Sequence, residues 1–220
     1  ATPERIDGYD IYKLFDNNIA YEIRLNQALE ADLLSPFHYY GISDLTIDDT
    51  FYDDFSQFSE LSYDEIAHKV KEAINRYSIP NTRRRGLIFV ARNEEGKILS
   101  EKLNTLGLRT LALSGADSES ARSCAFDRLE MDQDENSIEY LIAVDILNEG
   151  IDIPSLNQII MLRPTQSAIV FVQQMGRGLR KHPDKEFVTI IDFIGNYAHN
   201  YLIPVALYGD TTYNKDTLRR

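Results

Sequence analysis

The sequence predicts a doubly wound α/β domain with a mostly parallel sheet and a small helical insertion. The 220 residues are 43% hydrophobic and 26% charged, proportions typical of a globular protein with a packed core. From residue 86 onward, short apolar runs alternate with segments of helical periodicity, a pattern typical of parallel sheets with helices on both faces. No apolar run reaches the roughly 18 residues of a membrane span, so we expect no membrane partner.

Five apolar runs after residue 85 have the length of buried strands. They are GLIFVA (86–91), LRTLAL (108–113), IEYLIAV (138–144), QIIML (158–162) and FVTIID (187–192). A sixth candidate strand is PFHYYGIS (36–43). Helices are expected at 17–34, 62–77, 94–106, 118–131 and 168–179. In sheets of this class we expect the functional loops at the carboxyl ends of the strands.

Acidic residues are concentrated in the first third of the chain. The formal net charge is −12, with 16 acidic and 6 basic residues in 1–80 and 19 and 17 in 81–220. An acidic chain argues against a general nucleic-acid-binding surface, although the basic residues of the second part are clustered. The single cysteine, Cys124, excludes a disulfide framework and indicates a reducing, cytoplasmic location. The four scattered histidines offer no metal site.

The segment QQMGRGLR (173–180) is the strongest functional pattern. Gln173, Arg177 and Arg180 follow helical spacing and share one face. Gly176 and Gly178 each lower helix stability by about 1 kcal/mol relative to alanine, which indicates that something approaches closely there. Guanidinium groups suit phosphate oxygens because they offer paired donors and a permanent charge. The alternative is a helix end with glycine caps and a solvated basic face.

A second pattern, VDILNEGIDIP (144–154), directly follows a predicted strand. Gly150 permits a tight turn, and Pro154 ends the segment. Asp145, Glu149 and Asp152 place three carboxylates on one short loop. A carboxylate there can accept a hydrogen bond from a ribose hydroxyl or pair with an arginine. The alternative is an ordinary surface loop.

Together these patterns resemble the C-terminal motor domain, the second RecA-like domain, of superfamily 2 DEAD/DEAH-type helicases. Q-x-x-G-R-x-x-R (173–180) is similar to motif VI and N-E-G-I-D-I-P (148–154) to motif V. GLIFVARNEEG (86–96) occupies the place of motif IV, and LSGADS (113–118) resembles a loop that contacts the nucleic-acid backbone. ATPER (1–5) resembles the end of motif III. Within the superfamily, the sequence looks most like helicases related to restriction-enzyme motor subunits.

The resemblance divides the chain into four parts. The end of motif III, the interdomain linker and the first elements of the domain are assigned to 1–43. An acidic helical insertion is expected at 44–80, the helicase C-terminal RecA-like domain at 81–205 and a tail at 206–220. The resemblance is weakest over the insertion.

The family implies a role for each matching residue. Arg177 and Arg180 match arginine fingers that reach ATP held by another domain. Residues implied in ATP binding are Gln173, Gly150, Asp152 and Gly176. Residues implied in nucleic-acid binding are Ser114, Gly115 and Arg92. Val144 and Glu149 depart from the DEAD-box pattern, which carries threonine and arginine there, so DEAD-box RNA unwinding is a poor model.

The sequence contains no P-loop, the G-x-x-x-x-G-K-[ST] segment that holds nucleotide phosphates and Mg²⁺. The nearest segment, 91–98, lacks the first glycine and the hydroxyl residue, and DEIAH (64–68) lies in a predicted helix. We therefore expect ATP and Mg²⁺ to be bound by an N-terminal ATP-binding domain of the same protein. This chain alone is expected to hydrolyse no ATP.

The expected activity is that of a helicase or translocase that grips a nucleic-acid backbone. The resemblance favours DNA over RNA as the partner and is compatible with an attached nuclease domain. One alternative is a non-catalytic α/β interaction module that keeps the fold, for which the acidic first third is a credible binding face. Another is a self-contained flavodoxin-like nucleotide-binding protein, which the absence of a phosphate-binding glycine loop disfavours.

Overall fold

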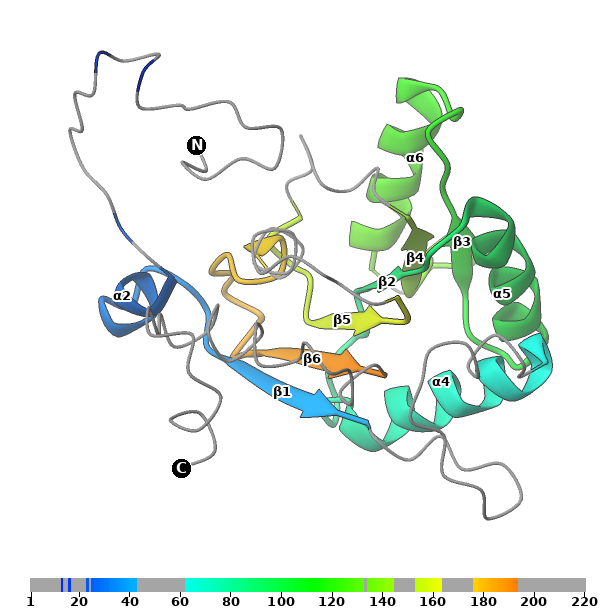
Figure 1. Cartoon of the computed structure of the whole chain (residues 1–220), viewed down its shortest axis with the longest axis horizontal. Helices are drawn as coiled ribbons and strands as arrows, with labels where there is room; N and C mark the ends of the chain where they lie inside the picture. The colour runs from blue at the N-terminus through cyan, green and yellow to red at the C-terminus, as the bar shows by residue number, and fades with distance from the viewer. Residues whose placement is uncertain are drawn as a thin grey trace.

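The computed structural model describes residues 25–42, 62–132, 134–144, 153–163 and 176–193, together with Lys13, Asp16 and Ile23. These residues include six strands: β1 (Phe37–Gly41), β2 (Gly86–Phe89), β3 (Thr110–Ala112), β4 (Tyr140–Ala143), β5 (Gln158–Met161) and β6 (Val188–Asp192). The strands form one sheet in the order β1-β6-β5-β2-β4-β3, and every neighbouring pair is parallel (Figure 1). All six predicted strands are confirmed.

The apolar runs form strands because both faces of the sheet are covered. Every residue of β2, β4, β5 and β6 is buried, as is typical of parallel sheets between helical layers. In the centre, Leu87 lies in register with Leu141 on one side and Ile159 on the other. Apolar side chains therefore point alternately into two cores.

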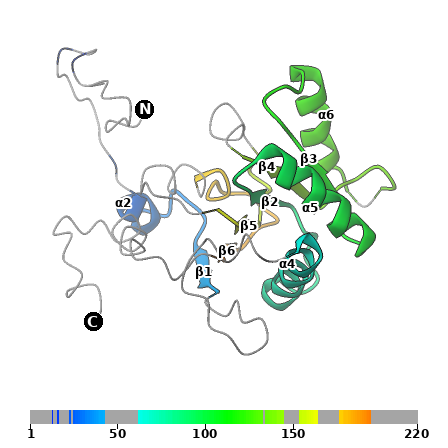
Figure 2. The ribbon, with the colours of Figure 1, turned by 45° about the vertical axis from the view of Figure 1, so that its right-hand side comes forward.

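Helices cover the two faces in pairs. α4 (Tyr63–Tyr77) and α5 (Asn93–Thr105) lie beside each other and bury Val70 and Leu99 against one face (Figure 2). On the other face, α6 (Glu119–Glu130) contributes Leu129 to the core, and α2 (Leu25–Glu30) packs Leu25 against the same core. The doubly wound α/β class is confirmed. α2 ends at Glu30, earlier than the helix predicted over 17–34, and residues 17–22 and 24 of that prediction lie outside the described residues.

Helix α4 is fixed at its first turn by a capping box. The Ser62 side chain accepts from the Glu65 amide, and the Ser62 amide donates to Glu65 Oε2 at 2.9 Å. These bonds satisfy two backbone groups that a helix start otherwise leaves unpaired. The helix then packs on the sheet, so part of segment 44–80 contributes to the main core. Residues 43–61 lie outside the described residues, and the division of the chain into four parts stays a prediction.

Candidate functional site

The described end of the motif VI-like pattern, residues 176–180, is called the arginine segment below. It lies at the amino edge of the sheet, where the strands begin. Gly178 faces Ile159 near the start of β5 and Val188, the first residue of β6. Leu179, which is fully buried, belongs to the core cluster to which α6 also contributes Leu129. The expectation that this chemistry lies at the carboxyl ends of the strands is therefore wrong for the arginine segment.

Donors from outside fix three successive carbonyl groups of the arginine segment. Lys185 Nζ donates to the Gly178 carbonyl at 2.7 Å. The Ser35 amide donates to the Leu179 carbonyl at 2.7 Å, and Ser35 Oγ donates to the Arg180 carbonyl at 3.0 Å. Helix ends leave their last carbonyls without partners inside the helix, so these contacts give the segment one defined backbone position.

The two glycines of the arginine segment differ in what surrounds them. A Cβ added at Gly178 would lie 3.0 Å from Ile159 Cδ1 and 3.2 Å from Val188 Cγ1. Among the described residues, a Cβ added at Gly176 would meet no atom within 4 Å. The close approach predicted from the glycines is thus, at Gly178, contact with the domain's own sheet. At Gly176, no described residue approaches this closely.

The arginines themselves differ in exposure. Arg177 is partly buried, whereas Arg180 is exposed beside Lys181, which forms an ion pair with Asp32 at 2.5 Å. The other residues predicted to bind ATP, namely Gln173, Gly150 and Asp152, lie outside the described residues. Of the residues predicted to bind or act on ATP, the structure therefore describes Gly176, Arg177 and Arg180, which are neighbours in the sequence.

A family model, the helicase conserved C-terminal domain, matches residues 68–182. This match covers more than half of the chain. The chain belongs to the helicase C-terminal domain family. The matched residues include the arginine segment, the loop after β3 and the start of α5, but they end before Lys185.

Relatives and solved structures agree with this family. A 51.5 kDa protein of a Lactococcus phage is 22% identical over 201 residues, covering 90% of this chain and 43% of the phage protein. The ATP-dependent RNA helicase SrmB of Haemophilus influenzae is 28% identical over 138 residues, 63% of this chain and 29% of SrmB. A fragment named as an HsdR subunit of a type I restriction enzyme from Vibrio vulnificus shares the fold, with a TM-score of 0.70 and 23% identity.

This helicase C-terminal domain spans less than half of these proteins. The HsdR likeness covers 94% of this chain and 41% of that fragment. Both curated relatives are likewise covered over less than half of their length. The family match and the shared fold confirm the family predicted from motifs V and VI and the RecA-like α/β fold.

The residues predicted to bind nucleic acid lie at the opposite, carboxyl edge of the sheet. Ser114 and Gly115 follow β3, and the loop is closed by a 2.5 Å bond from the Ser114 amide to Asp117 Oδ2. Arg122 Nη2 donates to the Gly115 carbonyl at 3.1 Å and to the Asp117 carbonyl at 2.8 Å. The loop therefore has a defined turn that presents exposed Gly115.

Arg92 follows β2 at the same edge and is the N-cap residue directly before α5. Its amide donates to Glu95 Oε2 at 3.1 Å, and its Nε lies 2.7 Å from Glu95 Oε1. The paired Glu95 carboxylate raises the pKa of Arg92 and balances its charge. A phosphate contact from Arg92 would compete with this ion pair, and one from the Ser114 amide would compete with its bond to Asp117, so Gly115 is the strongest candidate of the three.

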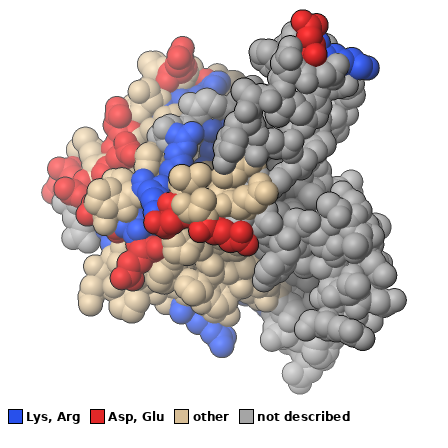
Figure 3. Space-filling model, turned by 90° about the vertical axis from the view of Figure 1, so that its left-hand side faces the viewer, with Lys and Arg blue, Asp and Glu red and all other residues tan. Residues whose placement is uncertain are grey.

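Basic side chains gather in the middle of the amino-edge face, among acidic ones (Figure 3). Two arginines shortly before β2 serve the fold. Arg83 Nη2 donates to the Ile138 carbonyl at 3.2 Å, and Arg85 Nη2 donates at 3.3 Å to both the Glu130 carbonyl and Asp132 Oδ1. Because Glu130 ends α6, Arg85 also stabilises the negative end of the helix dipole. Burial, and next the charge of Arg85, lower the pKa of Arg83.

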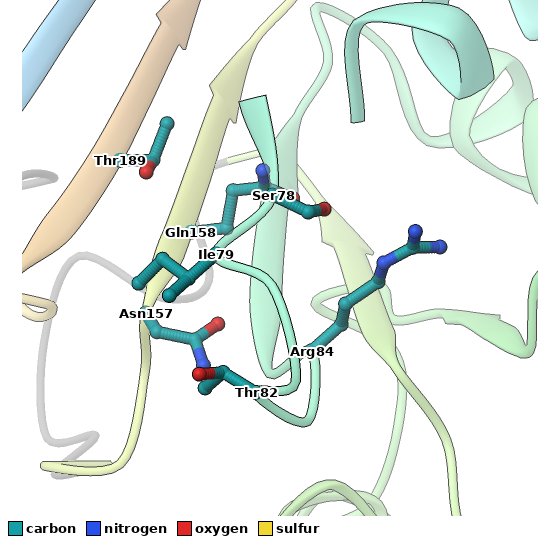
Figure 4. A pocket seen from close by; sticks show the side chains of 7 residues that line it. All are labelled: Ser78, Ile79, Thr82, Arg84, Asn157, Gln158 and Thr189. Atoms are coloured by element: carbon teal, nitrogen blue, oxygen red, sulfur yellow. The ribbon is translucent and has the colours of Figure 1, made fainter. Parts of the chain in front are cut away.

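A small polar pocket of about 10 Å³, room for a single water molecule, lies at this edge. Its lining residues are Ser78, Ile79, Thr82, Arg84, Asn157, Gln158 and Thr189 (Figure 4). Figure 4 shows the Arg84 guanidinium directed away from Asn157, and its Nη2 donates to Asn75 Oδ1 at 2.8 Å. The pocket is too small for a nucleotide.

Sequence reasoning missed Ser35 and Lys185, the residues that fix the arginine segment. Their only sequence signal is position, because each lies shortly before a predicted strand. Within the described ranges, no group of histidine, cysteine, aspartate and glutamate side chains is arranged to bind a metal ion. Among the same residues, no helix has the length and apolar character needed to cross a bilayer.

Proposed function

We propose that this domain is the second motor domain of an ATP-dependent helicase or translocase. Arg177 and Arg180 would complete the ATP site of an N-terminal domain when the two domains close. Their charges would stabilise the negative charge that develops on the γ-phosphate. In phosphoryl-transfer enzymes such an arginine accelerates turnover by about 10³–10⁵.

The backbone contacts of the arginine segment carry this proposal. An arginine contributes to transfer only when its guanidinium is held in place before the reaction. Three successive carbonyls, those of Gly178, Leu179 and Arg180, have outside donors, and Leu179 is anchored in the core. A fixed backbone at the edge of the domain is the arrangement that a residue acting on a neighbouring domain requires.

ATP and Mg²⁺ would be bound by the N-terminal domain, which would carry the P-loop that this sequence lacks. The residues of this domain would supply charge and complete the closed state. Gln173, Gly150, Asp152 and Gly176 would line the nucleotide side of the cleft. After hydrolysis the cleft would reopen, and the two domains would step along the track.

The nucleic-acid backbone would contact the loop after β3, at the edge opposite the arginines. Exposed Gly115 would let a phosphate approach the loop backbone closely, and contacts to phosphate carry no base sequence information. We propose DNA as the track because the fold is shared with the type I restriction enzyme fragment over 94% of the chain and, over 85% of the chain with a TM-score of 0.61, with the restriction-modification enzyme LlaBIII bound to DNA. Stimulation of ATP turnover by single-stranded RNA but not by DNA would contradict this choice.

The arginine role is tested by ATP turnover of the protein that carries both domains. Arg177→Ala should lower nucleic-acid-stimulated kcat by about 10³ or more, while ATP affinity changes by less than about tenfold. Arg76→Ala is a matched control, because Arg76 is an exposed arginine on α4 that lies over the Tyr77 ring. Wild-type turnover by Arg177→Ala would contradict the proposed role and favour a non-catalytic interaction module.

A further inference from the structure

Lys185 lies between the arginine segment and β6, and its side chain is enclosed by the protein. The residue is 8% exposed. Its ammonium group donates to the Gly178 carbonyl at 2.7 Å and to the Pro154 carbonyl. One side chain therefore joins the arginine segment to the end of the motif V-like segment.

A buried lysine is costly unless its charge is compensated. Within the described part of the chain, the contacts of Lys185 Nζ are these two carbonyl oxygens, and it forms no ion pair with a carboxylate. Burial lowers the pKa of Lys185 to about 8, so the group is largely charged at neutral pH. An apolar side chain of similar length would fill the same space without the desolvation free energy of an ammonium group. The two hydrogen bonds, rather than packing, therefore account for a lysine at this position.

The Pro154 carbonyl belongs to a firmly anchored turn. Ile153 and Leu156 on either side of it are buried in the core, at 1% and 0% exposure. Asn157 then joins the turn to the start of β2, since Asn157 Nδ2 donates to the Arg83 carbonyl at 2.7 Å and Asn157 Oδ1 accepts from the Arg85 amide at 3.1 Å. Lys185 thus connects the arginine segment to a fixed point of the sheet.

Ser35 fixes the arginine segment through the Leu179 and Arg180 carbonyls, from the chain that leads into β1. Lys185 fixes it through the preceding Gly178 carbonyl, to the turn before β5. The arginine segment is therefore attached on one side to the chain before β1 and on the other side to the turn before β5. Removing the Lys185 side chain would break the attachment to the turn before β5. The first arginine affected would be Arg177, because it directly precedes Gly178.

We propose that Lys185 is a positioning residue. By joining the Gly178 and Pro154 carbonyls, it would hold Arg177 where its guanidinium reaches ATP. This inference rests on the proposed function, because the arginine must act on ATP for its position to matter. Lys185 itself would not touch the nucleotide. It lies three residues beyond the part of the chain that the family model matches, which ends at residue 182.

The test compares Lys185→Met with Lys71→Met in the protein that carries both motor domains. Methionine keeps most of the length of the side chain and removes the donors. Lys71 is the matched control because its Nζ also donates to a backbone carbonyl, that of Leu106, at 2.6 Å, away from both motifs. Steady-state ATP turnover with saturating DNA gives kcat and KM, and circular dichroism gives the thermal midpoint.

Lys185→Met should lower kcat about tenfold or more, with KM for ATP within about twofold of wild type. Lys71→Met should keep the wild-type kcat. Lys185→Gln, which keeps one donor, should lie between wild type and Lys185→Met, and it decides the question if Lys185→Met does not fold. A kcat within about twofold of wild type in the folded Lys185 variant, or an equal loss in Lys71→Met, would overturn the inference.

Arg177→Ala in the same assay separates the two claims. If Arg177→Ala turns over ATP like wild type, the proposed function is wrong whatever Lys185→Met does. If Arg177→Ala is inactive and Lys185→Met is normal, the arginine role stands and only the positioning role of Lys185 is wrong.

Discussion

Gly176 and Gly178 stand two residues apart in the arginine segment and have different physical roles. Gly178 is packed so closely on β5 and β6 that a methyl group would press against Ile159 and Val188. Gly176 has no such neighbour among the residues that the structure describes. The sequence could not separate them, because a close approach to the protein's own core and a close approach to a ligand require the same residue.

We expect Gly178→Ala to lower the free energy of unfolding by about 1–3 kcal/mol through overpacking. Gly176→Ala should leave stability unchanged or raise it by up to about 1 kcal/mol, because alanine has less freedom in the unfolded chain. Urea unfolding of both variants measures the difference. Equal stabilities would mean that the Ile159 and Val188 contacts do not restrict residue 178.

The sequence predicts Arg177 and Arg180 as functional residues but gives no indication of the residues that fix them. The arginine pattern is local, since eight consecutive residues contain it. Ser35 reaches Arg180 across 145 positions and Lys185 reaches Pro154 across 31. Such partners are selected by the order of strands in the sheet, which no short pattern encodes.

At the scale of elements, the strands could be predicted because each apolar run is buried on both faces. The edge at which each functional segment lies could be predicted only in part. Chain that leaves the carboxyl end of β5 must return to the amino edge before β6 begins at Val188. The arginine segment lies at the end of this return, whereas Arg92, Ser114 and Gly115 lie directly after strands, at the carboxyl edge.

The loop after β3 and the arginine segment lie at opposite edges of the sheet. A substitution in the loop is therefore predicted to weaken nucleic-acid binding without changing ATP binding. Gly115→Asp places a negative charge on the exposed loop after β3, so DNA affinity should fall by about tenfold at low salt, with less loss at high salt. ATP affinity without DNA should not change. Asn75→Asp is the matched control, because it adds the same charge at the amino edge and keeps an acceptor for Arg84.

Fluorescence anisotropy of a labelled single strand measures both variants. An equal loss of affinity in the two variants would show that the effect is general repulsion. An unchanged affinity in Gly115→Asp would remove the loop after β3 from the proposed DNA contact.

At the scale of the whole molecule, the two predicted interfaces lie on opposite edges of one continuous sheet. A continuous sheet can transmit movement between ATP and nucleic acid, because a rotation that moves the arginines also moves the loop after β3. The relatives of this domain extend well beyond the part that it matches, in keeping with an ATP site shared with another domain.

The central claim is that Arg177 acts on ATP bound by that other domain, and mainly in the transition state. The most direct measurement compares the affinity of the two-domain protein for an ATP analogue with its affinity for ADP and aluminium fluoride, which mimics the phosphoryl group during transfer. Arg177→Ala should weaken binding of the transition-state mimic by about 10³ and binding of the ATP analogue by less than about tenfold. Equal changes in both affinities, or no change in either, would contradict the account.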